Sequence, residues 1–300
     1  MRVGILGGGR WGQALARLVK AAGNEPYIAY KDKKPPHVLK STKDQPKVSE
    51  SCDLLLVATS AAEVRQAIQL AKPGPGNRIV VAGRGLEPAS SKWLCDVVME
   101  ECSAVRVGAL AGPAPVDEIL NGGLCAGVIA SPYTDVGTLV TSALHSSRYR
   151  VYESHDLLGV QLAGALIPVL STLLGMALSL RGSGVGIHAL VLTRGLEEAS
   201  RLATAMGADP WTFAGLAGVG DLVAAQSRKD HPSFRAGAAL AKGNRDDGPL
   251  PVAQALLRLA DQHGVEMPLT QALVAIYDGM HPLDAVTALM SRSAAREHSS

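Results

Sequence analysis

Short apolar runs alternate with amphipathic stretches through the first half of the chain. Each run has the length and composition of a β-strand, and helical patterns separate most of them. The run DLLLVA at 53–58 is almost continuously apolar, as expected for a strand covered on both faces of a parallel sheet. The predicted strands cover residues 2–6, 26–30, 53–58, 78–82, 104–111, 124–130 and 149–152. This alternation predicts an α/β fold with a doubly wound parallel sheet.

The connections in this half are predicted to be mainly helical. Helical periodicity covers residues 61–71, 91–101 and 136–144. Residues 35–48 are instead rich in proline and lysine, and they predict a long loop.

Strand patterns stop after about residue 153, and the remainder predicts helices only. Ser154 is expected to be the N-cap of the first of them, with Asp156 in its first turn. From Leu157 to Leu180 no residue is charged, which suits either a membrane span or a helix buried on all sides. Three glycines, Pro168 and several polar side chains favour the buried helix, at a dimer interface, and Pro168 should kink or break it. Further helices are predicted at 187–206, 251–263, 269–278 and 282–291, with Asp209-Pro210 opening another.

The chain is therefore expected to form two domains, an α/β domain over residues 1–149 and an all-helical domain over 150–300.

The charge and cysteine content of the chain exclude several classes of function. The formal net charge of +2 argues against nucleic-acid or membrane-surface partners. The four cysteines form no metal-binding pattern, and Cys52 and Cys95 are expected to be buried reduced thiols. The chain opens on a strand rather than a signal peptide, so we expect a cytoplasmic protein without a membrane span.

A glycine-rich turn joins the first strand to the first helix. Gly7, Gly9 and Gly12 have the G-x-G-x-x-G spacing, follow a predicted strand and open a predicted helix. The first glycine allows the tight turn, the second lets a pyrophosphate approach the backbone, and the third allows the helix to pack closely on the strand. The phosphates would then lie at the positive end of the helix dipole. This context predicts dinucleotide binding, with Arg10 and Trp11 in contact with the cofactor.

The end of the second strand bears on the choice of cofactor. NAD sites usually carry an acidic residue there to bond the ribose 2′-hydroxyl. This chain has Lys31, whose cation suits the 2′-phosphate of NADP, followed by Asp32, which keeps NAD open. The alternative is that these residues belong to a solvated lysine-rich loop.

The candidates for the substrate site are the polar residues Arg84, His188, Thr193, Arg194 and Asp221. Arg84 leaves a predicted strand at its carboxyl end, where ligands bind in open α/β sheets. His188 is a candidate acid or base, against the alternative of a hydrogen-bonded structural residue. Asp221 in GVGDL orients a catalytic group or caps the following helix. Arg194 lies in an apolar helix, where a buried structural ion pair is the expected role.

Several segments resemble the bacterial NAD(P)-dependent glycerol-3-phosphate dehydrogenase family, in the same order over nearly the whole chain. They are GGGRWG (7–12), Gly112-Pro113, YRVYESHDLLGVQLAGAL (149–166), LTRGLEEASRLATAMGA (192–208), TFAGLAGVGDL (212–222) and GVEMPL (264–269). The resemblance implies a Rossmann domain followed by a helical substrate domain, and a homodimer. It implies reversible reduction of dihydroxyacetone phosphate with NAD or NADP, and it places Ala114 at the cofactor site.

This sequence departs from the family at the catalytic positions. Where the family has a lysine and an asparagine after G-A-L, this chain has Ile167 and Pro168. Arg84 stands at the family's second lysine; it keeps the charge but does not deprotonate at neutral pH. Asp221 is kept, but Ala225 replaces the threonine four residues on.

The phosphate-binding positions also differ. Pro232 and Ser233 stand where the family has an arginine and an asparagine, although Arg228, Lys229 and Arg235 lie nearby in the sequence. Gly186-Ile187-His188 replaces the family's N-A-K motif, and Gly248 replaces a glutamate near the nicotinamide. Two hypotheses therefore stand. The first is a dehydrogenase of this family acting on dihydroxyacetone phosphate or a related small carbonyl compound, and the second is a catalytically degenerate NADP(H)-binding sensor or subunit.

Overall fold

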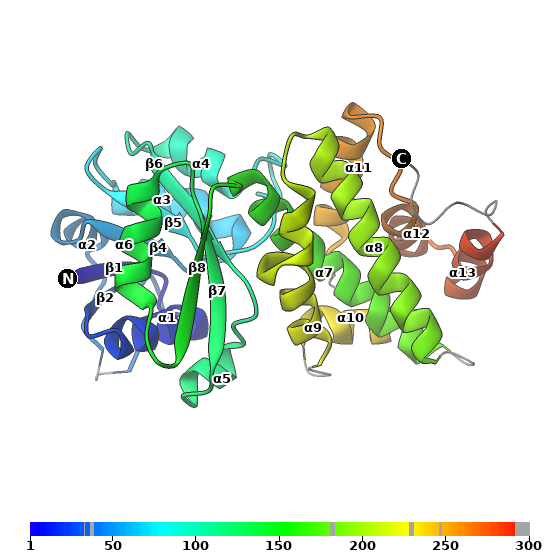
Figure 1. The fold of residues 1–300 in the computed structure, drawn as a ribbon, viewed down its shortest axis with the longest axis horizontal. Coiled ribbons are helices and arrows are strands. Elements are labelled where there is room, and N and C mark those ends of the chain that lie inside the picture. The colour runs from blue at the N-terminus through cyan, green and yellow to red at the C-terminus, as the bar shows by residue number, and fades with distance from the viewer. Residues whose placement is uncertain (33, 37–38, 181–183, 228–230, 246–247, 292–300) are drawn as a thin grey trace.

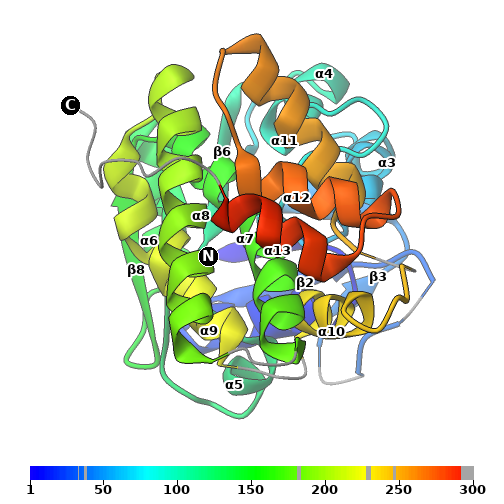
Figure 2. The same cartoon turned by 90° about the vertical axis from the view of Figure 1, so that its right-hand side faces the viewer.

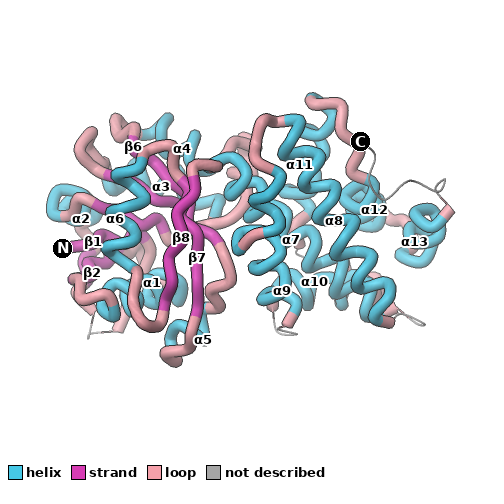
Figure 3. The backbone as a smooth tube through the Cα atoms, viewed as in Figure 1, coloured by secondary structure: helices cyan, strands magenta, loops and turns pink. Residues whose placement is uncertain are grey.

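The computed structural model describes residues 1–32, 34–36, 39–180, 184–227, 231–245 and 248–291. All its strands lie in one half of the molecule, and the long helices of the second half of the chain lie in the other (Figures 1 and 3). The eight strands form one sheet in the order β3-β2-β1-β4-β5-β6-β7-β8. Their bounds are β1 Arg2–Leu6, β2 Glu25–Ala29, β3 Ser41–Thr42, β4 Leu54–Val57, β5 Arg78–Val81, β6 Arg106–Ala111, β7 Cys125–Ala130 and β8 Tyr149–Ser154. The predicted Rossmann-type sheet followed by a helical half is confirmed.

The sheet is not wholly parallel, because β7 runs antiparallel to β6. The prediction of a fully parallel sheet was wrong at this strand. The segment between β6 and β7 contains only the short helix α5 (Val116–Leu120), which cannot carry the chain back across the sheet. β7 therefore starts at the edge where β6 ends. Because β8 is parallel to β7, it also starts at that edge, beside the carboxyl ends of the other strands.

Helices cover both faces of the sheet. One face packs on α1 (Arg10–Ala21), α5 and α6 (Thr134–Leu144), with Val3, Ile5 and Ile129 among the buried strand residues. The other packs on α2 (Gln45–Ser51), α3 (Val64–Ala71), α4 (Leu94–Glu101) and the start of α7 (Leu157–Ser179). The long loop predicted over 35–48 was wrong in part, because it includes β3 and the start of α2. Asp44 accepts a hydrogen bond from the Lys47 N–H and caps that helix, a signal that the sequence carried.

The helical half surrounds α7, which connects the two halves (Figures 1 and 2). The other helices are α8 Val185–Ala205, α9 Asp221–Gln226, α10 Pro232–Leu240, α11 Leu250–Gln262, α12 Pro268–Tyr277 and α13 Pro282–Met290, with a 3₁₀ helix at Pro210–Ala214 and a π-helical turn at Leu216–Gly220. The predicted helices at 187–206, 251–263, 269–278 and 282–291 are confirmed to within two residues at each end. Asp209 caps the 3₁₀ helix as predicted, accepting from the Trp211 N–H. The sequence predicted a helix after Asp221, which is α9, but did not predict α10.

Small residues let α10 lie directly against α7. A Cβ at Gly175 would come within 2.1 Å of the Phe234 carbonyl oxygen, and a Cβ at Gly237 within 1.9 Å of the Thr172 oxygen. Such distances are possible only between backbones without an intervening side chain. This contact fixes the start of α10 relative to the core of the molecule.

Helix α7 satisfies the length and apolarity test for a membrane span, but most of its residues are buried inside the protein. It continues through Pro168, so the predicted break does not occur. Proline removes only the N–H that would bond to the Gly164 carbonyl, and the packing around α7 holds the helix together. Its N-cap is Asp156, which accepts from the Gly159 N–H at 2.9 Å, and not Ser154 as predicted. Cys52 and Cys95 are buried free thiols, as expected.

Candidate functional site

The glycine-rich turn forms the floor of a cleft at the carboxyl edge of the sheet. Gly7 has φ +127°, and a Cβ there would lie 2.8 Å from the Ala58 carbonyl oxygen. A Cβ at Gly12 would lie 1.9 Å from the Gly7 oxygen, so the first turn of α1 rests directly on the loop. A Cβ at Gly9, by contrast, would meet nothing within 4 Å. The backbone at Gly9, the N-cap of α1, therefore faces open space into which a phosphate fits.

The cleft above this turn, called here the glycine-loop cleft, has a volume of about 440 Å³. It runs from the β1–α1 turn to the end of β2, where Lys31 and Asp32 line it. The Lys31 Nζ donates to the Gln66 Oε1 at 3.1 Å, and both Lys31 and Asp32 are exposed to solvent. Lys31 thus lies at the wall of the cleft rather than in a detached loop.

Arg10 and Trp11 connect this cleft with two further cavities. The Trp11 indole N–H donates to the Ala82 carbonyl at 2.7 Å, which holds the ring at the end of β5. The ring also lines a cavity of about 310 Å³, called here the Trp11 cavity, together with Gly83, Ala111 and Ala114. Arg10 forms an exposed ion pair with Asp117 on α5. Of the predicted cofactor residues, the structure brings Gly7, Gly9, Arg10, Trp11 and Lys31 to the glycine-loop cleft and Ala114 to the Trp11 cavity, while Gly12 is buried beneath the turn.

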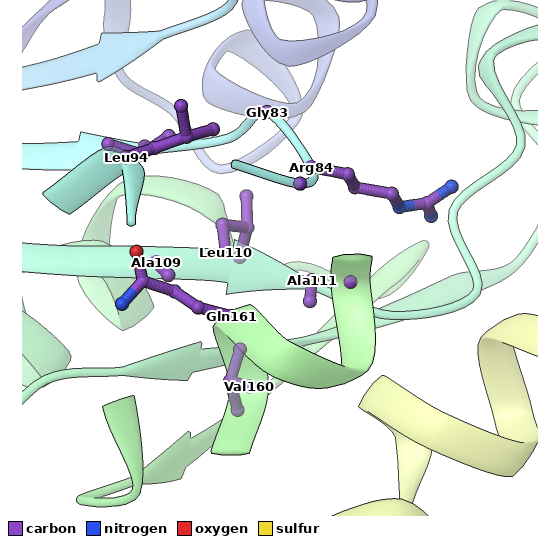
Figure 4. A pocket seen from close by; sticks show the side chains of 11 residues that line it. Gly83, Arg84, Leu94, Ala109, Leu110, Ala111, Val160 and Gln161 are labelled. Carbon is purple, nitrogen blue, oxygen red and sulfur yellow. The ribbon is translucent and has the colours of Figure 1, made fainter. Parts of the chain in front are cut away.

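The most informative contact joins Arg84 to Asp221, which are 137 positions apart. Arg84 leaves the end of β5, and its guanidinium points away from Leu94 and Leu110 (Figure 4). It donates to Asp221 Oδ1 at 2.7 Å and lies 2.5 Å from Oδ2. The Asp221 side chain is 4% exposed, while that of Arg84 is 34% exposed. The carboxylate is therefore buried behind the guanidinium, and part of the guanidinium stays open to ligand.

Neighbouring groups favour the ionised form of the Asp221 carboxyl. Burial raises the pKa of this carboxyl to about 6, while Arg84 and the Gly112 N–H oppose that rise. The group is thus mostly ionised at neutral pH and pairs with Arg84. Asp221 is the first residue of α9 and not its N-cap, which is Gly220, so the predicted capping role was wrong. Its side chain contacts Arg84 instead.

A third cavity of about 310 Å³, called here the Arg84–Asp221 cavity, lies between the two halves. Its lining residues come from α1, the β5–α4 and β6–α5 connections, α5, α9 and the start of α10, and those with polar side chains are Arg10, Arg84, Asp117, Asp221 and His231. Ala225 and Pro232, two of the departures from the family pattern, also line it. Ser233 is not among the lining residues, and its carbonyl accepts from the Thr172 hydroxyl.

Other predicted residues lie elsewhere. Ile167 is 2% exposed and belongs to the apolar core around α7. His188 contacts the Gln226 side chain at the end of α9 and does not line any of these three cavities. Arg194 pairs with Glu197 one turn along α8 and is partly exposed, so the predicted buried pairing was wrong. Arg228 and Lys229 lie outside the described residues, and Arg235 is exposed on α10.

Several lining residues were missed by the sequence reasoning, among them Tyr149 and His231. Tyr149 is the first residue of β8 and lines the Trp11 cavity. A wholly parallel sheet would have placed it at the opposite edge. His231 lines the Arg84–Asp221 cavity just before α10. The signal that could have indicated it is the His-Pro pair, typical of a residue that precedes a helix and is held at its start.

Gly248 is also explained by its surroundings. A Cβ at this position would lie 1.8 Å from the Tyr277 hydroxyl. The tyrosine thus fills the space that a side chain at 248 would need, and a glutamate cannot be accommodated without moving it.

Two family models match the chain. The model described as the NAD-dependent glycerol-3-phosphate dehydrogenase N-terminus matches residues 27–136. The model of the C-terminus of the same enzyme matches residues 156–288.

Individual proteins agree with these models over most of their length. The chain is 34% identical to a glycerol-3-phosphate dehydrogenase [NAD(P)+] of Pseudomonas syringae pv. tomato, covering 86% of this chain and 80% of that protein. It is 35% identical to the protein of the same name from Symbiobacterium thermophilum, covering 99% and 96%. Its structure is similar to the crystal structure of glycerol-3-phosphate dehydrogenase from Coxiella burnetii, with a TM-score of 0.86, 26% identity and coverage of 97% and 99%.

Proposed function

The chain belongs to the NAD-dependent glycerol-3-phosphate dehydrogenase family, and we propose that it reduces dihydroxyacetone phosphate, or a closely related small ketone, to a secondary alcohol with NADPH or NADH. One observation carries this proposal. The partly exposed Arg84 guanidinium, backed by the buried Asp221 carboxylate, borders both the Trp11 cavity and the Arg84–Asp221 cavity. A cation thus stands between the place for a nicotinamide and the place for a substrate.

The residues of the chain perform defined tasks in this reaction. The glycine-rich turn and the N-terminus of α1 would hold the pyrophosphate, and Trp11 and Ala114 would line the place of the nicotinamide. The bound cofactor supplies a hydride. Arg84 donates a hydrogen bond to the carbonyl oxygen and stabilises the negative charge that grows there. The Asp221 carboxylate and the Gly112 carbonyl accept from Arg84 and hold it in position. Residues 1–149 would serve as the cofactor domain and residues 150–300 as the substrate and dimerisation domain, except that β8, which ends at Ser154, belongs to the sheet.

A direct assay tests this function. Oxidation of NADPH and NADH is followed with dihydroxyacetone phosphate and with unphosphorylated dihydroxyacetone, and cofactor binding is measured separately by calorimetry. We expect turnover of the phosphorylated ketone. Cofactor binding with no ketone turned over would instead support the sensor or subunit reading.

That second reading rests on Ile167, which carries no charge and no proton at the family's lysine position. We expect Ile167→Lys to raise kcat/KM by less than about tenfold and to lower the melting temperature, because a buried lysine without a counter-ion is costly. Ile167→Met serves as the volume-matched apolar control. A rise in kcat/KM of about a hundredfold or more in Ile167→Lys would show that the pocket still accepts the family's lysine. That result would contradict the interpretation that the other substitutions have changed the substrate site.

The cofactor preference is assigned to Lys31. Its cation would contact the 2′-phosphate of NADP at the end of β2, so we expect Lys31→Ala to weaken NADPH binding roughly fivefold to tenfold, about 1–1.4 kcal/mol. NADH binding should change less than twofold. Calorimetry with both cofactors checks this, with Asp32→Ala as the control. An equal loss of affinity for NADPH and NADH would show that Lys31 does not contact the 2′-phosphate.

We place the protein in the cytoplasm as a soluble homodimer with no membrane span. The apolar residues Leu178, Val185 and Leu190 are exposed where α7 ends and α8 begins, and Val185 is 86% exposed. A second copy would cover them. Light scattering of the detergent-free protein tests the state, with a monomer at micromolar concentration as the contradicting result.

A further inference from the structure

Ketone reduction needs a proton as well as a hydride, and the proposed function leaves its source open. Arg84 stays protonated throughout the accessible pH range, so it stabilises charge without transferring a proton. Ile167 has no proton to give. Asp221 is buried and paired with Arg84, and protonating it would remove the charge that holds the guanidinium. The proton donor must therefore be sought among the other residues of the Arg84–Asp221 cavity.

The lining of that cavity contains one further group of suitable chemistry. Within the described part of the chain, the polar side chains that line it are Arg10, Arg84, Asp117, Asp221 and His231. Arg10 and Asp117 pair with each other on the α1 and α5 side. The imidazole of a histidine ordinarily titrates near pH 6.5, so it can both give and take a proton around neutral pH. His231 is the imidazole in this lining.

His231 is also held firmly enough for this task. It directly precedes Pro232, the first residue of α10, and α10 lies backbone to backbone on α7 at Gly175 and Gly237. The ring is half-buried, with its Nδ1 atom buried. It therefore lines the same cavity as the Arg84–Asp221 pair and is supplied by a different element.

We propose that His231 is the catalytic acid of ketone reduction and, in the reverse direction, the catalytic base; this rests on the proposed function. The carbonyl carbon receives a hydride from the reduced nicotinamide, and the π electrons of the C=O bond move to the oxygen. That oxygen takes the proton from the imidazolium N–H of His231. The neutral imidazole regains a proton from water in the open cavity. The sum is ketone, reduced cofactor and one proton giving alcohol and oxidised cofactor.

The charged groups facing the imidazole set the expected pH dependence. Among the described residues that line the cavity with His231, the cations Arg10 and Arg84 would favour a neutral ring, and the carboxylates Asp117 and Asp221 would favour a protonated one. Reduction requires the imidazolium, and its kcat should fall as the pH rises through the imidazole titration. Oxidation of the alcohol requires the neutral ring, and its kcat should fall as the pH drops through the same range.

The test compares His231→Gln with the native chain in both directions across pH 5 to 9. We expect kcat to fall roughly 10²-fold or more and the imidazole limb to disappear from both profiles, while KM and the cofactor Kd change less than about threefold. His263→Gln, exposed at the end of α11, is the matched control and should behave as the native chain. His188→Gln separates the proposal from the other candidate histidine.

Each other outcome overturns the proposal. A raised KM with unchanged kcat would make His231 a substrate-binding residue. If the imidazole limb of the kcat profiles disappeared in His188→Gln and remained in His231→Gln, His188 and not His231 would be the catalytic acid. No turnover of any ketone by the native chain, with cofactor binding retained, would overturn the proposed function and the role of His231 with it.

Discussion

Replacing Arg84 with methionine is expected to lower kcat/KM for ketone reduction by roughly 10²–10³-fold, the usual loss when one preorganised donor to a developing oxyanion is removed. The physical reason is twofold. The substitution removes the cation that borders both cavities, and it leaves the Asp221 carboxylate buried without its partner. Burial already raises the pKa of Asp221 to about 6, so without Arg84 the group should be protonated at higher pH still. Steady-state kinetics at pH 7.5 measure the loss.

Two matched variants show which property of Arg84 matters. Arg84→Lys keeps the charge but offers a smaller set of donors, and we expect it to retain activity within about tenfold of the native chain. Asp221→Asn keeps the shape but removes the counter-charge, and should cost nearly as much as Arg84→Met if Asp221 positions the guanidinium. The two losses should not add in the double variant, because the residues act as a unit. Full additivity would show that the residues act separately.

The fall in kcat/KM of the native enzyme at low pH should also reflect the protonation of Asp221. Its raised pKa means that the ion pair is intact above about pH 6 and is lost as the pH falls through that value. A profile of Arg84→Lys should keep this limb, whereas Asp221→Asn should lack it.

The second large effect is expected from Gly12→Ala. A methyl group at this position would come within 1.9 Å of the Gly7 carbonyl oxygen, and backbone cannot give way as a flexible side chain does. Helix α1 must shift from the turn, so we expect dinucleotide affinity to fall at least about a hundredfold and the melting temperature to fall by several degrees. Calorimetry and thermal unfolding measure the two effects.

Gly9→Ala is the matched control, because its methyl group would enter open space in the protein alone. We expect this variant to fold as stably as the native chain and still to bind dinucleotide at least about tenfold more weakly, since the methyl would occupy the place of the pyrophosphate. Native affinity in Gly9→Ala would show that no phosphate approaches this turn. Native stability in Gly12→Ala would show that α1 does not rest on Gly7.

Much of the fold could be predicted from the sequence because it depends on short-range pattern. Apolar runs and helical periodicity located most strands and helices, since burial of one face fixes the spacing of side chains within a few residues. The glycine-rich turn is equally local: the positive φ of Gly7 and the contact of Gly12 on Gly7 lie within six positions of one another. The motifs around TRGLEE and VGDL likewise indicated the family that the whole chain matches.

The sequence predicted the site only in parts. It identified Arg84 and Asp221 as separate candidates but did not predict their contact. That contact depends on how the helical half positions α9 next to the end of β5. It selected His188 as a candidate acid or base, whereas the cavity is lined by His231. No local pattern distinguishes two histidines whose difference is only their place in space.

The sequence by itself determined the Rossmann-type sheet, the helical second half and the dinucleotide turn. Only the tertiary structure decided the direction of β7, the edge at which Tyr149 stands, and the partner of Asp221. The reason is physical. Strand direction follows from whether a connection can cross the sheet, and ion pairs follow from the docking of helices distant in sequence, so both depend on packing that no single segment encodes.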